Sequence, residues 1–395
     1  MTSVSSATPE IELLRSRFPY LGEKAYFNYG GQGPMPRSAI TAIIDAQDYI
    51  QKAGPFSGAV NGWLSQEASQ TRSAIAQELG TTPDTITLTE DVSVGCNIAL
   101  WGMDWQPGDQ ILMTDCEHQG IIAAVRELQR RFELDVSICP LLNTLNSGDP
   151  VSTIQQHLTP KTRLVVLSHI LWNTGQVLPL AEIVKVCHEF SADQQIRVLV
   201  DAAQSVGVLP LNLTHLEADF YAFTGHKWWC GPAGVGGLYV RPEAQLNPTF
   251  IGWRSVITNA AGDPVSYQSD GRRYEIATSA VPLYAGLRSA IALHSQFAPA
   301  EERYRLLCDR SAYLWQRLTD LPNVTCLKTS PPEAGLISFQ IDSGKHQSLV
   351  QFLEEKDCFV RTILNPNCIR ACVHYFTTES EIDALIDLIS YQLNQ

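Results

Sequence analysis

The sequence predicts an α/β protein whose large domain holds a mainly parallel seven-stranded sheet and whose smaller α/β domain lies at the C-terminal end. Between about residues 60 and 245, short apolar runs alternate with segments of helical periodicity. After about residue 282 this alternation stops. The chain has 395 residues, 45% hydrophobic and 17% charged, enough to bury a large core and to divide into two domains. We expect a large domain over 21–282 and a small one over 283–395, with residues 1–20 packing against the small domain.

Seven apolar runs of strand length predict the sheet of the large domain. They are Thr85–Leu88, Gln110–Thr114, Val136–Pro140, Arg163–His169, Arg197–Asp201, Phe220–Phe223 and Gly236–Val240. Segments with helical periodicity fit between these runs. The clearest of them are Trp63–Leu79, Val92–Leu100, Gly120–Arg131 and Leu180–Phe190.

A long helical segment opens the small domain. It covers Leu283–Phe297 and continues past Pro299 to Leu318, and we expect it to bridge the two domains. The predicted elements after it are strands near Asn323–Lys328 and Gly335–Ile341, a helix over Gln347–Lys356, a hairpin of Cys358–Ile363 and Ile369–Tyr375, and a helix over Glu379–Leu393. Such a hairpin indicates antiparallel strands.

The segment from Tyr26 to Pro36 is too rich in glycine and proline for regular structure. We expect a loop that brings backbone close to a ligand or to a partner subunit.

Composition excludes several classes of function. A formal net charge of -13 argues against nucleic-acid binding and attraction to membrane surfaces, which need clustered Lys and Arg. No run approaches the roughly 18 apolar residues of a membrane span, and the first ten residues lack the features of a signal peptide, so we expect a cytoplasmic protein. Ten cysteines include no CxxC pair, so no zinc ribbon, dithiol motif or other metal site is expected.

One lysine has the surroundings of a covalent cofactor site. Lys227 lies between Thr224, His226 and a glycine-rich loop, and Asp201 ends an apolar strand upstream of it. A lysine can form a Schiff base with pyridoxal phosphate (PLP), and the ring nitrogen of that cofactor needs an anionic partner. The pair predicts a PLP site.

Further polar residues follow other predicted strands. Because ligands bind beyond the carboxyl ends of the strands in open α/β sheets, these residues should meet in one crevice. The candidates are Ser93 with Val94 and Gly95, His118, Asn173, Asp201 with Gln204, and Thr224 with His226 and Lys227.

Each candidate has an expected role and a plainer alternative. His118 would stack on the cofactor ring, or it is an ordinary core histidine. Asn173 and Gln204 would donate to the phenolate oxygen, or they bond loop backbone. Ser93 and the neighbouring backbone N–H groups would bind phosphate at a helix N-terminus, with Thr224 and His226 opposite, or Ser93 is a buried hydroxyl.

The combination resembles the class V aminotransferase-like branch of fold-type-I PLP enzymes, the branch of cysteine desulfurases, kynureninases and isopenicillin N epimerases. The TEDV near Thr89 and a short NPN turn look similar to the cyanobacterial cysteine/cystine C–S lyases. The matching pieces span nearly the whole chain: YFNYGGQGPMP from Tyr26, EH at Glu117, SHILWNTG from Ser168, VDAAQSVG from Val200, FTGHKWWCGPAGVGGLYV from Phe223 and IRACVHYFTTESEID from Ile369.

The resemblance implies a role for each matching residue. Lys227 becomes the Schiff-base lysine, His118 the stacking base and Asp201 the partner of the ring nitrogen, with Thr224 and His226 as phosphate ligands. Arg370 would bind the α-carboxylate of the substrate with the help of Arg361, because a guanidinium holds a carboxylate by two hydrogen bonds.

The resemblance also implies a homodimer with shared active sites. Thr278 would then bind the phosphate of the second subunit, although Ala277 stands where the family usually has glycine. Trp253 and Arg254 are candidates for a wall of the site contributed across the interface.

The expected reaction is β-elimination. Desulfurases of this branch attack sulfur with a cysteine on a mobile loop, whereas only eight residues separate Arg361 from Arg370 here, and Cys368 would lie on a stiff strand facing the side of Arg370. L-Cystine or L-cysteine would give pyruvate, ammonia and a persulfide or sulfide, with cystine preferred because the persulfide leaves more readily. The product could supply sulfur to an iron–sulfur assembly protein.

Three alternatives stay open. The first is a cysteine desulfurase that uses Cys368 and forms alanine. The second is an aminotransferase for small amino acids, which would need a keto-acid acceptor. The third is a non-enzymatic module for sulfur or iron–sulfur carriers on a PLP fold.

Overall fold

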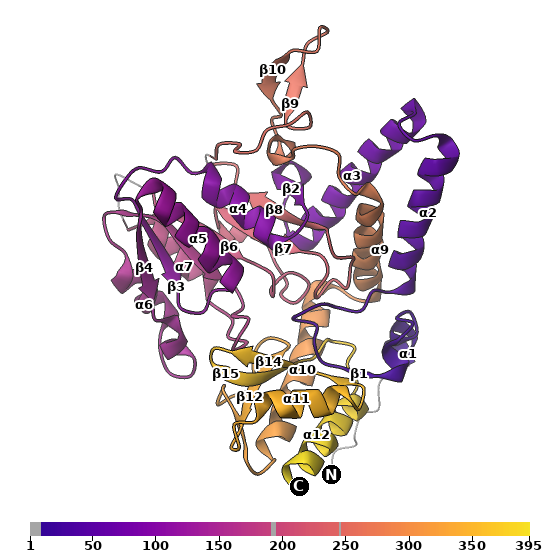
Figure 1. Cartoon of the computed structure of the whole chain (residues 1–395), viewed down its shortest axis with the longest axis vertical. Coiled ribbons are helices and arrows are strands. Elements are labelled where there is room, and N and C mark those ends of the chain that lie inside the picture. The colour runs from indigo at the N-terminus through magenta and orange to yellow at the C-terminus, as the bar shows by residue number, and fades with distance from the viewer. Residues whose placement is uncertain (1–8, 191–194, 245) are drawn as a thin grey trace.

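The computed structural model describes residues 9–190, 195–244 and 246–395. Its larger part holds a seven-stranded sheet with helices on both faces (Figure 1). The strands, in spatial order, are β2 (Ile86–Thr89), β8 (Gly236–Val240), β7 (Phe220–Thr224), β6 (Arg197–Asp201), β5 (Thr162–Ser168), β3 (Gln110–Thr114) and β4 (Asp135–Cys139). Strand β8 runs antiparallel to both of its neighbours, and the other pairs are parallel. The predicted fold class is confirmed.

The apolar runs have a direct cause in the layered arrangement. Along β5, Leu164 packs into the core on one face of the sheet and Val165 into the core on the other. Because both faces are covered, successive residues are all apolar rather than alternating with polar ones. The covering helices and one short turn of helix are α3 (Gly58–Leu79), α4 (Val92–Gly102), α5 (Gln119–Phe132), α6 (Pro150–His157), α7 (Leu180–His188) and α8 (Leu213–Leu216).

Two helices replace the single long helix that we predicted. Helix α9 (Val281–Phe297) ends before α10 (Ala300–Thr319). Between them Ala298 is extended, with φ −164°, and Pro299 follows. Proline disfavours helical conformation in the residue before it and has no N–H for a helical hydrogen bond, so the helix cannot continue.

The smaller part is an antiparallel sheet, as predicted. Its order is β11 (Val324–Cys326), β12 (Leu336–Ile341), β15 (Asn367–Cys372) and β14 (Arg361–Leu364), with α11 (His346–Glu354) and α12 (Glu379–Leu393) packed on it. The expected strand over 358–363 is divided. Its first residues form β13 (Cys358–Phe359), which pairs with β1 (Ala25–Tyr26), and the rest belongs to β14.

The N-terminal residues described by the structure contact the small part. Helix α1 (Pro9–Arg15) ends at Arg15, whose guanidinium donates to Phe376 O at 2.9 Å and to Glu381 Oε1 at 2.8 Å. Residues 1–8 of the predicted N-terminal segment lie outside the described residues. The division at 21 and 283 stays a prediction.

Two features near the surface were not predicted. Helix α2 (Arg37–Ala53) packs against α9 so closely that a Cβ on Gly286 would lie 2.6 Å from Ile43 Cγ1. A hairpin of β9 (Val256–Thr258) and β10 (Pro264–Tyr267) projects from the body of the molecule (Figure 1). It exposes the apolar side chains of Ile257 and Val265.

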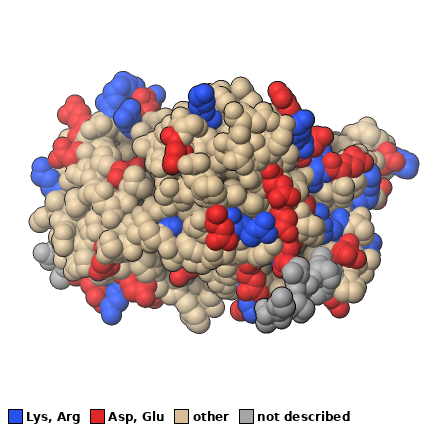
Figure 2. All heavy atoms as spheres, turned by 90° about the horizontal axis from the view of Figure 1, so that it is seen from below, with Lys and Arg blue, Asp and Glu red and all other residues tan. Residues whose placement is uncertain are grey.

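The charge on the surface is mixed. Figure 2 shows acidic and basic side chains interspersed on the face seen from below. Within 9–190, 195–244 and 246–395, no helix has both the length and the apolar character needed to cross a bilayer.

Candidate active site

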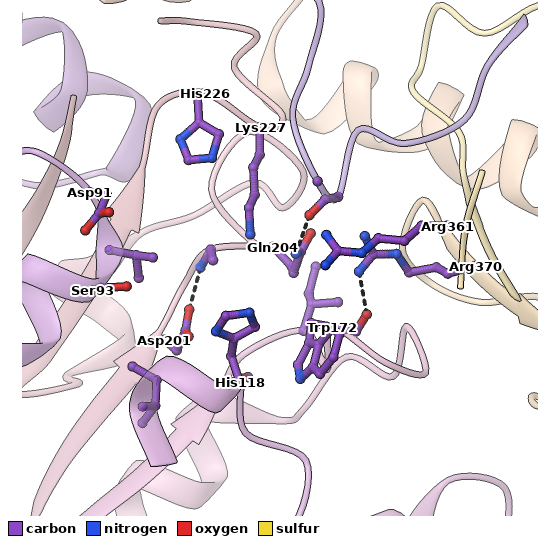
Figure 3. Close-up of a pocket in the computed structure, with 17 residues that line it drawn as sticks. Asp91, Ser93, His118, Trp172, Asp201, Gln204, His226, Lys227, Arg361 and Arg370 are labelled. Carbon is purple, nitrogen blue, oxygen red and sulfur yellow. Dashed lines mark hydrogen bonds between the residues drawn. The ribbon is translucent and has the colours of Figure 1, made fainter. Parts of the chain in front are cut away.

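A cavity of about 240 Å³ lies where the carboxyl ends of the central strands face the β14–β15 hairpin (Figure 3). The loop over 26–36 closes one side of the cavity, at Gly30 and Gly31, and its closeness to a ligand or a partner subunit stays a prediction. The sequence-predicted residues that line the cavity are Ser93, His118, Asp201, Gln204, His226, Lys227, Arg361 and Arg370.

Lys227 extends into this cavity from the loop after β7, toward Asp201 and His118 (Figure 3). Burial lowers the pKa of Lys227 to about 8, opposed by the charge of Asp201 and assisted by Arg370 and Arg361. At pH 7 about a tenth of the amine is therefore neutral, against less than about a thousandth at the usual pKa of 10.5, and a nucleophilic or basic lysine requires this neutral form.

Asp201 ends β6 on the floor of the cavity. Burial raises the pKa of its carboxyl group, while a hydrogen bond from Ala203 N at 2.9 Å and the charges of Lys227 and His118 act against burial. A buried carboxylate with one backbone donor needs a cationic partner to stay ionised.

His118 is the N-cap of α5. Its Nδ1 accepts from Gly120 N at 3.2 Å, so the other ring nitrogen carries the hydrogen when the ring is neutral. Burial lowers the pKa of His118. The charge of Asp201 raises this pKa, whereas the charges of Lys227 and the two arginines lower it further. The ring meets Trp172 edge to face, with centroids 5.4 Å apart. Both contacts fix the orientation of a neutral imidazole.

Arg370 and Arg361 are directly opposite residues of β15 and β14. Arg370 is 1% exposed and donates from Nη1 to Trp172 O at 2.7 Å, but its buried Nε and Nη2 have no partner among the described residues. Burial, followed by the charge of Arg370, lowers the pKa of Arg361. Buried guanidinium donors without partners at a cavity wall indicate an anionic ligand such as a carboxylate.

Gln204 connects the two loops that border the cavity. Its Nε2 donates to Gly30 O at 2.9 Å, and its Oε1 accepts from Trp228 Nε1 at 2.9 Å. The amide thus holds the glycine loop against the segment after Lys227, and one N–H remains for a ligand.

Comparison with known families agrees with this geometry. The model of the family described as aminotransferase class-V matches residues 26–385. The chain belongs to the class-V aminotransferase family.

Two solved structures of the cystine C–S lyase C-DES are similar to this class-V chain. The complex of C-DES with its reaction product cysteine persulfide is 52% identical, with a TM-score of 0.93, and the match covers 94% of this chain and 99% of that one. A lysine-to-alanine mutant of C-DES with glycine covalently linked to its PLP cofactor is 51% identical, with a TM-score of 0.94, covering 95% and 98%.

Curated relatives are more distant. Isopenicillin N epimerase of Streptomyces clavuligerus is 28% identical over 385 residues, which cover 92% of this chain and 93% of that protein. Cysteine desulfurase of Escherichia coli O127:H6 is 26% identical, covering 96% and 97%. The resemblance that the sequence suggested is confirmed.

Several predicted residues of this class-V chain lie away from the cavity. Val94 N donates to Asp91 Oδ1 at 2.9 Å and Gly95 N to Asp91 O at 3.2 Å, so these amides are already satisfied within the helix. Ser93 alone of that group lines the cavity. Thr224 lies behind His226, with Oγ1 2.6 Å from its Nδ1.

Asn173 also takes a different place. Its Nδ2 donates to Asn365 O at 3.1 Å, in the turn of the β14–β15 hairpin. Its buried Oδ1, an acceptor only, has no partner in the part of the chain that the structure describes. One of its two amide N–H groups is thus used by the hairpin turn, and Asn173 is not among the residues that line the cavity, so the expected bond from Asn173 to a cofactor oxygen stays a prediction.

Thr278 and Trp253 lie in neighbouring cavities. Thr278 lines one that shares Asp91 and Ser93 with the lysine cavity. Trp253 is 64% exposed and lines another, with the guanidinium of Arg254 5.2 Å from its ring centroid.

Sequence reasoning missed three residues at this site. Trp172 and Ser168 line the cavity, and Glu117 lies beneath them, accepting from Ser168 N at 3.0 Å and from Ser168 Oγ at 2.8 Å. Burial raises the pKa of Glu117 to about 8. Ser168 ends β5 and Trp172 precedes Asn173, so the rule that selected residues after strands could have found both.

Proposed function

We propose that this chain is a PLP-dependent carbon–sulfur lyase that performs β-elimination on L-cystine or L-cysteine. One observation carries the proposal: the cavity joins Lys227, Asp201 and the two free guanidinium donors of Arg370, and no thiol is among the described residues that line it. The similarity to the cystine C–S lyase C-DES supports the same reaction class.

The residues present fit the cofactor. The carboxylate of Asp201 and the amine of Lys227 line one cavity, and a cationic ring nitrogen would give Asp201 the partner that its burial requires. Ser93 and His226 line the cavity too and would hold the phosphate, with Thr224 fixing His226 from behind. Asp91 already satisfies Val94 N, so these side chains must supply most of the phosphate contacts.

Bound PLP supplies an electron sink for the charge left when a proton departs from the α-carbon. Arg370 binds the α-carboxylate through its free donors and thereby orients that C–H bond. Lys227 Nζ, with its pKa near 8, takes the proton. The Cβ–S bond then breaks, and sulfur departs with the bonding electrons. Hydrolysis of the remaining three-carbon amine gives pyruvate and ammonia.

Cys368 is poorly suited to attack sulfur as a desulfurase thiol would. It lies within β15 and is fully buried. Burial raises the pKa of its thiol to about 11, so little thiolate exists near neutral pH. A thiol fixed in the central pair of a sheet also cannot move to a substrate, which favours elimination over sulfur transfer.

Cystine is the expected preferred substrate. Cleavage of cystine releases a cysteine persulfide, a better leaving group than hydrosulfide because it is the more acidic thiol. The persulfide would be available to an iron–sulfur assembly protein, which we propose as a downstream partner.

Product analysis tests the proposal. Purified protein is given cystine, cysteine or cysteine sulfinate, and pyruvate and alanine are measured, with and without glyoxylate. We expect pyruvate, faster from cystine, unaffected by glyoxylate and retained by Cys368→Ser. Alanine formation that disappears in Cys368→Ser would indicate a cysteine desulfurase. Stimulation of turnover by glyoxylate would indicate an aminotransferase. Bound PLP without any turnover would indicate a binding module.

We also propose a homodimer with shared sites. The cavity lined by Thr278 adjoins the lysine cavity through Asp91 and Ser93. Apolar side chains lie exposed nearby, including Phe250 at 55% and Ile276 at 46%. A second subunit covering this area would bring further groups to the phosphate end of the site.

A further inference from the structure

Two buried histidines that the proposed reaction does not use hold the backbone after Lys227. His374 Nε2 lies 2.9 Å from Trp228 O, and His294 Nε2 lies 3.0 Å from Trp229 O. We infer that His374 and His294 are positioning residues for Lys227, and that His374 couples Lys227 to the carboxylate-binding Arg370. The inference rests on the proposed function for the roles of Lys227 and Arg370.

Chemistry fixes the state of both rings. A carbonyl oxygen only accepts, so Nε2 of each histidine carries the hydrogen. Nδ1 of His294 then accepts from the hydroxyl of Tyr375 at 2.8 Å. Burial lowers the pKa of His294 to about 3 and that of His374 well below its usual value. Because both pKa values are lowered, the two rings are neutral N–H donors. They stack on each other with centroids 5.6 Å apart.

The segment from residue 226 to 229 is held at four consecutive carbonyls. His226 O accepts from Gly33 N at 2.8 Å, and Lys227 O accepts from Cys230 N at 3.0 Å. The histidines hold the next two carbonyls. Space is also tight on the other side, since a Cβ on Gly33 would lie 2.2 Å from Lys227 O. Fixed backbone on both sides of Lys227 directs its side chain into the cavity.

The coupling to Arg370 follows from the course of the chain. Arg370 lies in β15, and His374 comes four residues later, two residues beyond the end of that strand. Tyr375, the next residue, binds His294 of α9. His374 thus joins the end of the strand that carries Arg370 to the carbonyl of Trp228, next to Lys227.

Replacement of the ring tests this inference. His374→Leu keeps the approximate volume and removes the N–H, whereas the side-chain amide of His374→Gln can reach the same carbonyl. The measurements are kcat and KM for cystine, and the pH midpoint of the visible absorption of lysine-bound PLP. Because small displacements of a reacting group cost up to about a hundredfold in rate, we expect kcat to fall about tenfold or more in His374→Leu. The pH midpoint should move, KM should change less than kcat, and His374→Gln should restore all three.

Phe376→Leu is the matched control. Phe376 is buried and stacks on His374 with centroids 4.1 Å apart, so this change loosens the same cluster without removing a donor to the lysine segment. It should lower the thermal midpoint while leaving the absorption midpoint in place. His294→Leu and His294→Gln repeat the comparison should His374→Leu fail to fold.

Two outcomes would overturn the inference: an unchanged kcat and absorption midpoint in His374→Leu, or equal shifts in His374→Leu, His374→Gln and Phe376→Leu. The second would mean that the histidines serve packing alone. Failure of the proposed function would be distinguishable from failure of this inference. The wild-type protein would then bind PLP without releasing pyruvate, and the variants could still be compared by their absorption midpoints.

Discussion

Individual residues at this site acquire their chemistry from burial. Lys227 and Asp201 are both removed from water, and each lessens the shift that burial imposes on the other's pKa. Arg370 adds a buried positive charge whose free donors face the same cavity. The cavity thus contains buried acidic and basic groups, and it suits ligands that carry both positive and negative charges. An amino acid together with a phosphorylated pyridine would carry both.

Cofactor uptake should depend on the pKa of Lys227. Only the neutral amine attacks an aldehyde, and the lowered pKa places half of the amine in that form near pH 8 instead of 10.5. Apoprotein mixed with PLP at a series of pH values should therefore develop its visible band with a rate that rises to a plateau above about pH 8. Lys227→Ala should give no such band. A rate that continues to rise through pH 10 would contradict the buried environment of the amine.

Glu117 should make stability fall with rising pH. Its pKa is raised from 4.5 to about 8 by burial, so the folded state keeps a proton that the unfolded state loses between these values. The stabilisation is complete below about pH 4.5 and is lost as pH rises through about 8. In Glu117→Gln this part of the pH dependence should vanish, as measured by urea unfolding at several pH values. Exposed Glu182→Gln serves as the control and should follow the wild-type profile.

At the scale of elements, the site depends on strands of one sheet ending at a common edge. Residues after β3, β5, β6 and β7 reach the cavity for this reason. The opposite edge carries a structural ion cluster instead. Asp219, fully buried, accepts from Val198 N, His188, Arg197 and Arg241 at 2.8 to 3.0 Å. It thereby joins the starts of β6 and β7 to the end of β8.

Asp219→Asn should destabilise the fold without changing the chemistry. Removing one partner of a buried ion cluster leaves charges unpaired and costs about 3 kcal/mol in free energy of unfolding. Urea unfolding measures the loss, and kcat of the folded variant should stay within about twofold because the cluster lies at the far edge of the sheet. Asp135→Asn, which removes an exposed ion pair with Lys161, should cost less than about 1 kcal/mol. Equal costs for the two variants would count against the role of burial.

At the scale of the whole molecule, the two parts of the chain build the cavity together. Arg361 and Arg370 come from the small sheet, while Asp201 ends a strand of the large sheet and Lys227 lies in the loop after another. Two hydrogen bonds next to the site join the parts. Arg370 donates to Trp172 O, and Asn173 donates to Asn365 O. Relative motion of the parts would therefore change the position of Arg361 and Arg370 against Lys227.

The proposed dimer makes a further prediction. Phe250→Glu places a charge in the exposed apolar area beside the Thr278 cavity, where burial against a second subunit would be costly. We expect a shift toward monomer in sedimentation velocity and a fall of about tenfold or more in kcat/KM for cystine. Tyr391→Glu, equally exposed on α12, should leave both unchanged. A monomeric wild-type protein with full activity would contradict shared sites.

The sheet strands and the placing of Lys227 and Asp201 at one cavity could be predicted from the sequence, because apolar runs and residues just after strands are local patterns. The hydrogen bonds of the candidate side chains depend instead on the tertiary structure. Gln204 donates a hydrogen bond to Gly30, which is 174 positions away in the sequence, and Asn173 donates one to Asn365, which is 192 positions away. Neither partner could be predicted from local spacing. Burial likewise arises only when both parts pack together, and burial sets the pKa values on which the proposed chemistry depends.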